Sequence, residues 1–276
     1  MIILVRGTAD SNSENYADRI TAALAANSAL TYGKKTVVLQ LSNFNPVENV
    51  LYGKRFKESS IASESYQIDD SGLDAIIRRL SMGRLTDEQF ADCGYTFNNC
   101  LNIVGPSKET DIAKTLAGNP NLLKEILVNA NEIYNTVYVF VRGRDAELRK
   151  ALISLNMIQK EIVCVPQGNA IDEEVKRDKE IETLYAVKNF DEGSIFTLRT
   201  MAKSYNTKNI YPIPYNVAFK DACLSESAWY FFNMNINPTD SDDNGRLISC
   251  ISALNGSVTG ITEPYIKERH FVIKKK

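Results

Sequence analysis

Short, wholly apolar runs separated by longer helix-like stretches most constrain what this chain can fold into. Runs that are apolar at every position are typical of strands buried on both faces, and intervening helices favour a parallel sheet covered on both sides. We predict strands at residues 2–5, 36–41, 100–104, 136–141, 161–166, 182–187 and 209–214. Helices are predicted at residues 14–29, 121–134, 145–155, 194–205 and 243–254. The expected fold is α/β, with a doubly wound, mostly parallel β-sheet and helices on both faces.

The composition is that of an ordinary globular protein. The chain has 276 residues, 44% of them hydrophobic, and a net charge of -2. No linker divides it, so we expect one domain over residues 1–276, with a flexible basic tail at 268–276. A charge this near zero gives no bulk signal for nucleic acid, and specific DNA binding is not expected. No apolar run reaches the roughly 18 residues of a membrane helix, and the opening run is too short for a signal peptide, which predicts a cytoplasmic protein.

Cysteine and histidine give no sign of a metal or redox site. The number of cysteines is odd, and no pair has the short spacing of a zinc knuckle, so buried free thiols are expected. The single histidine, His270, excludes a histidine-based triad and a multi-histidine metal site, and we expect it on the surface. The cysteines are Cys93, Cys100, Cys164, Cys223 and Cys250.

Residues 7–15, between the first predicted strand and its helix, read GTADSNSEN. Many α/β proteins bind phosphate at this place, on the N–H groups of the helix N-terminus. A phosphate loop needs glycines to wrap the phosphates, a lysine for their charge and a Ser or Thr for magnesium. This stretch has one glycine, no lysine and two acids, Asp10 and Glu14.

The order of elements and several local phrases resemble the MinD/ParA family of deviant P-loop ATPases, which includes the TadZ/CpaE branch. In that family the phosphate loop has the sequence G-K-G-G-x-G-K-T-T and precedes a helix that ends in L-A. With Leu24 and Ala25 as that ending, GTADSNSEN aligns with the loop without a gap. Gly7 keeps the first glycine, Thr8 takes the place of the signature lysine, and Glu14 that of the magnesium-binding threonine. The other aligned positions are Ala9, Asp10 and Asn12 (at glycines), Ser11, Ser13 (at the second lysine) and Asn15.

Two acidic sites of the family are altered in the same way. Its second strand ends in D-x-D-P, and here Gln40 and Ser42 stand at the two aspartates. A later strand ends in D-x-P, and here Phe140 replaces the aspartate that supports the metal. The alternative for Gln40 and Ser42 is a polar strand end, and we interpret Arg142 and Arg144 as a solvated loop rather than an anion contact. The resemblance thus implies no metal and no catalytic residue.

The later part of the chain keeps the family pattern better. The family reads adenine with an asparagine in V-x-N after a strand, and AVKNFDEGS supplies Asn189. The loop of its I-P-Y-[DN] motif forms one side of the adenine pocket, and here NIYPIPYNVAFKDA supplies Pro214, Tyr215 and Asn216. The resemblance makes these four residues adenine-side candidates. The alternative is that the two asparagines are turn residues, a role that asparagine favours.

The substituted loop is a poor phosphate site on electrostatic grounds. Two like charges 4 Å apart repel by about 4 kcal/mol at an effective dielectric near 20, which is on the order of three decades in affinity. Capping of the helix by Asp10, Ser11, Asn12 or Ser13, with Glu14 against the helix dipole, would satisfy the free N–H groups internally. We hypothesise a self-capped remnant of a phosphate loop, with no cofactor; weak ATP binding is the alternative.

The resemblance implies a non-catalytic scaffold or positioning factor for a bacterial assembly, either pilus or secretion machinery or partition machinery. It implies protein partners, as a homodimer or a heterodimer with an active relative. The alternative is an atypical ATP-binding switch or weak ATPase. A further alternative is contact with the inner face of the membrane through the tail, where Lys267, Arg269 and residues 274–276 surround three apolar residues; a solubilising tail or an edge strand is favoured.

Overall fold

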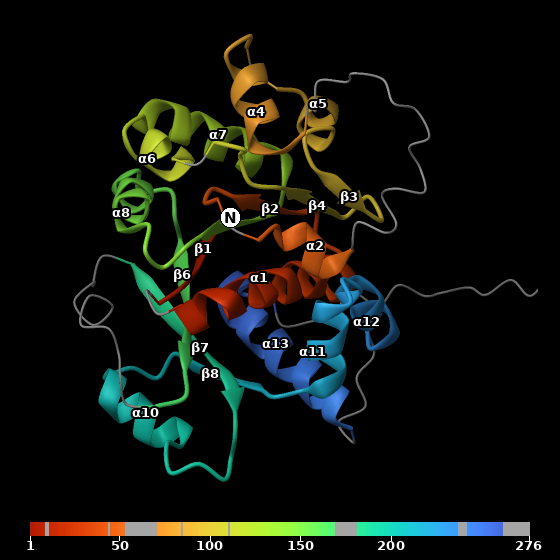
Figure 1. The fold of residues 1–276 in the computed structure, drawn as a ribbon, viewed down its shortest axis with the longest axis vertical. Coiled ribbons are helices and arrows are strands. Elements are labelled where there is room, and N and C mark those ends of the chain that lie inside the picture. Colours follow the sequence, from red (N-terminus) through yellow and green to blue (C-terminus); the bar gives the residue numbers. More distant parts are fainter. Residues whose placement is uncertain are drawn as a thin grey trace, which may run out of the picture.

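An eight-stranded sheet of order β3-β4-β2-β5-β1-β6-β7-β8 forms the centre of the molecule in the computed structural model (Figure 1). The structure describes the chain except for residues 9–10, 44, 53–70, 84, 110, 169–180, 237–241 and 262–276, and the side chains of residues 11–15. Among the described strands β3 alone is antiparallel to its neighbour. The strands are β1 (Ile2–Gly7), β2 (Thr36–Gln40), β3 (Tyr95–Phe97), β4 (Leu101–Val104), β5 (Thr136–Val141), β6 (Lys160–Pro166), β7 (Glu182–Phe190) and β8 (Ile210–Pro214). The predicted doubly wound α/β fold is confirmed.

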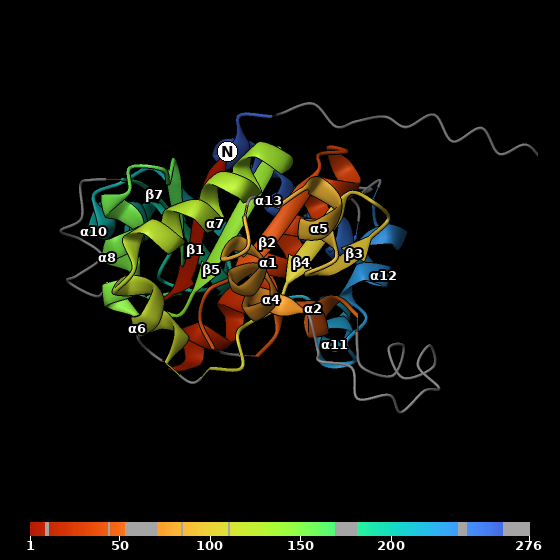
Figure 2. The same cartoon turned by 90° about the horizontal axis from the view of Figure 1, so that it is seen from above.

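Helices cover both faces of the sheet, as the all-apolar strands require. One face carries α1 (Ser11–Thr31), α2 (Val47–Leu51), α11 (Val217–Leu224), α12 (Ala228–Met234) and α13 (Asp243–Thr259). The other face carries α4 (Gly72–Leu80), α5 (Asp87–Ala91), α6 (Ile112–Ala117), α7 (Pro120–Ile133), α8 (Ala146–Ser154) and α10 (Leu198–Tyr205). Figure 2 shows α7 and α8 lying across the strands, with α13 behind them.

The central strand β1 lies between β5 and β6, with Val5 opposite Phe140 and Ile162. Alternate side chains of β1 enter opposite cores, so Ile3 and Val5 pack under α1 while Ile2 and Leu4 pack under α7 and α8. Helix α1 is enclosed, since it contacts the sheet, α2, α12 and α13. This enclosure gives even the polar positions of α1 a buried environment.

Some predicted boundaries are wrong for identifiable reasons. The predicted helix from residue 194 begins instead at Leu198, because the Thr197 side chain accepts a hydrogen bond from the N–H of Thr200 and caps it. The three-residue edge strand β3 was not predicted, nor were helices α2, α4, α5, α6, α11 and α12. All of these helices except the nine-residue α4 have eight residues or fewer, too few to establish a periodicity. Asp242 caps α13, because its side-chain oxygen accepts a hydrogen bond from the N–H of Gly245.

Three further expectations concern surfaces and thiols. The five cysteines are free as expected, but Cys100 and Cys250 are only partly buried, whereas Cys93, Cys164 and Cys223 are buried. Burial raises the pKa of Cys164 and of Cys223 to about 12, which keeps both thiols protonated. Within the described part of the chain, no helix combines the length and apolar character needed to cross a bilayer. His270 and the basic tail at 268–276 lie outside the described residues, so their roles stay predictions.

Candidate functional site

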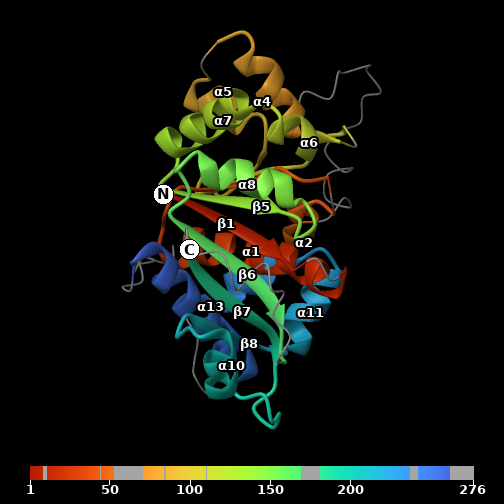
Figure 3. The same ribbon diagram turned by 90° about the vertical axis from the view of Figure 1, so that its left-hand side faces the viewer.

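The carboxyl ends of the parallel strands meet at one edge of the sheet, toward α2 and α11 in Figure 3. At this edge β1 ends at Gly7 and α1 begins at Ser11, three residues earlier than predicted. The residues after Gly7 up to the helix contain no glycine, so no position favours the left-handed backbone of a wrapping loop. Asp10 and the side chains of Ser11, Asn12, Ser13, Glu14 and Asn15 lie outside the description, and their capping roles stay predictions.

Backbone from a neighbouring loop packs directly against the end of β1. A methyl group built on Gly143, just after β5, would lie 2.3 Å from the carbonyl oxygen of Thr8 and 2.6 Å from that of Gly7. Real Cβ atoms do not approach backbone oxygen so closely. Gly143 therefore allows the β5–α8 loop to close over the end of β1, where Thr8 is buried.

We expect Gly143→Ala to destabilise the fold by about 1–3 kcal/mol, because the loop must move away from the Thr8 carbonyl. Thermal denaturation followed by circular dichroism measures the effect. Gly168→Ala is the matched control, since a methyl group there meets nothing within 4 Å among the described atoms. Equal melting temperatures for the two variants would show that the loop contact is unimportant.

Gln40 and Ser42 are both buried and are hydrogen-bonded to backbone groups. The Gln40 amide donates to the carbonyls of Ser42 (3.3 Å) and Asn45 (3.2 Å), and its oxygen accepts from the N–H of Val47 (3.0 Å). The Ser42 hydroxyl oxygen accepts from the N–H of Arg142 at 3.1 Å. These contacts hold the turn between β2 and α2 in place, which fits the polar strand-end interpretation.

Phe140 and Arg142, near the carboxyl end of β5, also contact the protein's own core and turns. Phe140 is buried in the core beneath α1, where it offers neither charge nor a metal ligand. Arg142 is half-buried, and its guanidinium donates to the carbonyl of Asn43 at 3.0 Å. The solvated-loop prediction is therefore wrong for Arg142, because its neighbours in the β2–α2 turn hold it against the protein; Arg144 is exposed as predicted.

Asn189 occupies an irregularity in β7, where the pairing with β8 shifts between Lys188 and Phe190. Its φ of 51° lies in the left-handed region, which asparagine tolerates better than most residues. Its backbone lies near the hydroxyl of Tyr16 on α1 and acts to lower the Tyr16 pKa, but burial outweighs this effect and raises that pKa. A bulge that ties β7 to α1 accounts for an asparagine at this position without a ligand.

Asn216 is buried and caps α11. Its side-chain oxygen accepts from the N–H of Phe219 at 2.7 Å, and its amide donates to the side chain of Asn244 at 3.0 Å. Pro214 ends β8 in a buried position, whereas Tyr215 is half exposed beside Lys220. The four adenine-side candidates thus lie on the adjacent ends of β7 and β8, and a capping role explains Asn216.

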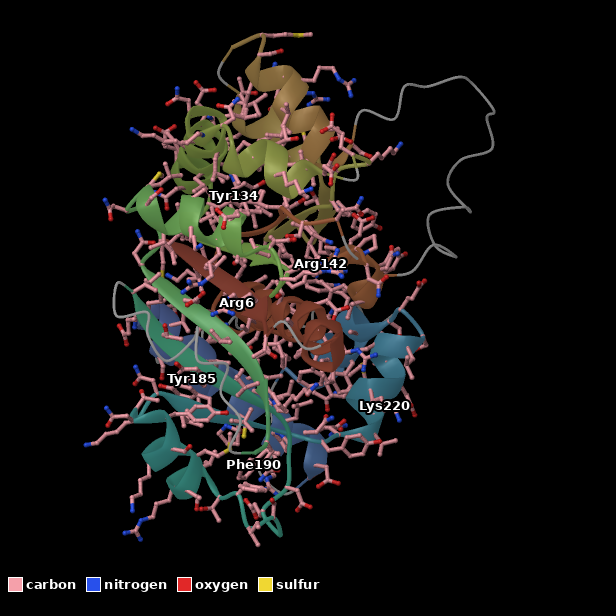
Figure 4. The ribbon with its side chains drawn as sticks, turned by 60° about the vertical axis from the view of Figure 1, so that its left-hand side comes forward. Arg6, Tyr134, Arg142, Tyr185, Phe190 and Lys220 are labelled. Atoms are coloured by element: carbon pink, nitrogen blue, oxygen red, sulfur yellow. The ribbon has the colours of Figure 1, made fainter. Side chains whose placement is uncertain are left out.

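A buried ion-pair cluster centred on β1 and β6 was not predicted. Arg6, on β1, donates to the Glu161 carboxylate at 2.7 Å, and Arg149, on α8, donates to both oxygens of that carboxylate at 2.6 and 2.8 Å. Burial acts to raise the pKa of Glu161, but the two guanidiniums outweigh it and hold that pKa below its usual value. Figure 4 shows Arg6 at the centre of the molecule.

Asp18 is a second missed residue, on the second turn of α1. It is 5% exposed, and burial raises the pKa of its carboxyl to about 7, an effect that the adjacent Arg19 only partly offsets. The thiols of Cys164 on β6 and Cys223 on α11 lie near enough to respond to its charge. Perturbed pKa values of this kind occur at functional sites in clefts, but Asp18 lines neither of the two best-defined cavities.

The two best-defined cavities lie away from this edge. One, of about 230 Å³, is lined by Lys35, Asp87 and Tyr134 near the starts of β2 and β5. The other, of about 270 Å³, lies between Tyr32 at the end of α1 and Gly256 of α13. Both are at the amino end of the sheet, opposite the edge where β1 runs into α1. Within the described residues, no group of three or more His, Cys, Asp or Glu is placed to hold a metal ion.

No family sequence model and no curated protein matches this chain. Solved structures do match its fold. A ParA family ATPase from Chlorobium tepidum TLS has a TM-score of 0.68 at 12% identity, over 92% of this chain and 98% of that one. A chain of the MinC:MinD cell division protein complex from Aquifex aeolicus has a TM-score of 0.61 at 12% identity, over 97% and 99% of the two chains.

A complex of an McdA variant with ATP, from Cyanothece, gives a TM-score of 0.58 at 10% identity, over 95% of this chain and 97% of that one. In each comparison the structural similarity covers nearly the whole length of both chains. The chain therefore has the fold of the ParA and MinD ATPases, as the sequence resemblance implied. At such low identities the likeness establishes the fold, and the residue-by-residue correspondence of the loops remains a sequence inference.

Proposed function

We propose that this chain is a non-catalytic protein of ParA/MinD fold that works as a dimerising scaffold or positioning factor in a bacterial assembly. The observation that carries the proposal is the internal use of polar groups at the carboxyl edge. Gln40, Ser42 and Asn216 all direct their side chains to the protein's own backbone. In this proposal the carboxyl edge, where a nucleotide would bind, instead holds the ends of β1, β2, β5 and β8 in place.

The charges at the matched positions also support the proposal. Phosphoryl transfer depends on positive charge and metal at the transferred group, together with a residue that orients the nucleophile. Gln40, Ser42 and Phe140 supply no carboxylate for a metal, and Thr8 supplies no ammonium group. The residues present do not fit Mg-ATP, and we derive no catalytic step through it.

Relatives of the same fold support a role that depends on protein partners. One matching structure is a complex of MinC with MinD, and others are a ParA family ATPase and McdA. Each of those functions belongs to the protein named. By analogy, a chain that keeps the fold and lacks the charges would retain partner binding while losing nucleotide control. The TadZ/CpaE-like role in pilus or secretion machinery is one version of this proposal.

Addition of Mg-ATP is expected to change neither the melting temperature nor the rate of phosphate release above that of buffer. Binding to the folded state alone at 100 times Kd would stabilise it by about 2.7 kcal/mol, so even modest affinity would raise the melting temperature by several degrees. Differential scanning fluorimetry and a phosphate-release assay make the two measurements. A saturable shift, with or without release, would instead favour the atypical ATP-binding switch.

A further inference from the structure

Large apolar side chains are exposed along one short stretch of this protein. Five of them, each between 52% and 67% exposed, come from the β8–α11 connection, α11 and α12. They are Tyr215, Val217, Leu224, Tyr230 and Met234. Apolar residues gathered in this way mark interaction surfaces, whereas single exposed ones need no explanation.

The helices beneath this stretch form a firm support. On α11 the inner side chain Phe219 packs against Phe231 and Phe232 of α12, with ring centroids 5.6 and 5.7 Å apart. The two phenylalanines of α12 meet edge to face at 5.5 Å. Because their inner faces are fixed by these contacts, the outer apolar residues of the two helices cannot turn inward to hide from water.

The outer face of α11 has a self-complementary order. Val217, Lys220, Asp221 and Leu224 are all exposed and follow a helical spacing, so they form one stripe along the helix. Read in either direction, the stripe runs from an apolar residue through two charges to an apolar residue, and the two charges are opposite in sign. Figure 4 shows Lys220 at the outer edge of the molecule.

We propose that this face of α11 and α12 binds a second copy of the chain, with the two α11 helices antiparallel across a two-fold axis. The axis passes between Lys220 and Asp221. Val217 of each copy then lies opposite Leu224 of the other, and each Lys220 lies opposite the Asp221 of the other copy. A two-fold contact requires a patch that complements itself, which this stripe provides in both apolar and charged positions.

The contacts of Lys220 and Asp221 within one copy are compatible with this pairing. The Lys220 ammonium lies 3.4 Å from the Tyr215 hydroxyl and 5.8 Å from the centre of its ring. Within the described residues Asp221 makes no ion pair. The acidic and basic groups are thus both available to a second copy. The inference rests on the proposed function in one respect, namely that pairing needs no nucleotide.

Sedimentation equilibrium on charge-reversed variants tests this geometry. The parent chain is expected to dimerise without nucleotide. Lys220→Asp alone, or Asp221→Lys alone, sets like charges opposite each other and raises the dimer Kd by about tenfold or more. The double variant Lys220→Asp/Asp221→Lys restores both opposite pairs and returns the Kd to about the parent value. Lys203→Asp, on the exposed face of α10, is the matched control and leaves Kd unchanged.

Three outcomes would overturn the proposal: a parent chain that stays monomeric at about 100 μM, single reversals that leave the Kd unchanged, or a double variant as weak as the single ones. A parallel titration with Mg-ATP separates the two claims. If nucleotide binds while the charge swap behaves as expected, the interface stands and the proposed function fails. If no nucleotide binds and the swap has no effect, the proposed function stands and the interface fails.

Discussion

Glu161→Gln is expected to cost about 3–5 kcal/mol of folding stability, since it removes a negative charge that two buried guanidiniums share. Arg6 and Arg149 share this carboxylate, and the side chains of Arg6, Arg149 and Glu161 are only 7%, 12% and 1% exposed. The cluster joins β1, β6 and α8, and β1 is far from the other two in the sequence. Its loss therefore weakens long-range contacts at the centre of the sheet.

Urea denaturation at pH 7 followed by circular dichroism measures this loss of stability. Glu192→Gln is the matched control, because it removes the same charge from the exposed pair that Glu192 forms with Arg246. Exposed ion pairs contribute about 0–1 kcal/mol, so the control is expected to unfold almost as the parent does. If the two glutamine variants are equally stable, the buried cluster does not hold the sheet together.

Asp18→Asn is expected to stabilise the protein at pH 8 and to remove part of its pH dependence. Burial raises the pKa of this carboxyl from 3.8 to about 7 in the folded state. Between those values the folded chain keeps a proton that the unfolded chain has lost, so stability falls as pH rises through this window and levels off above about 7. A shift of this size corresponds to at most about 4 kcal/mol at pH 8.

The difference in unfolding free energy between parent and Asp18→Asn, measured at intervals from pH 4 to 8, isolates this one group. It is expected to grow with pH up to about 7 and then stay constant. Asp92→Asn, at an exposed position just after α5, is the matched control and should show no such growth. A difference between parent and Asp18→Asn that does not vary with pH would mean that the buried carboxyl titrates normally.

The apolar runs were sufficient to predict the sheet, because a strand buried on both faces leaves the same signature wherever it occurs. The seven runs correspond to all the parallel strands, and the missed strand β3 is a three-residue edge with one exposed side chain. Helix α13 extends five residues beyond its predicted end, to Thr259, because the left-handed Gly260 ends it. A helix C-terminus with glycine is a signal that the sequence did contain.

The candidate site was only partly predictable. Local phrases located Gln40, Ser42 and Asn216, but their partners are backbone groups that become known only once the turns are built. Asp18 could not be predicted, because a polar position on a helix normally faces water and α1 is enclosed by the sheet and its neighbouring helices. Arg6 and Glu161 are 155 positions apart, and no local pattern connects them.

Isothermal titration of the parent chain with Mg-ATP determines whether the carboxyl edge of the sheet serves the protein's own structure or binds a nucleotide. We expect no saturable heat up to millimolar ATP, and the same result with Mg-ADP, because the polar groups of this edge bind the protein's own backbone. One-to-one binding with a Kd in the micromolar range, about -8 kcal/mol, would contradict this expectation.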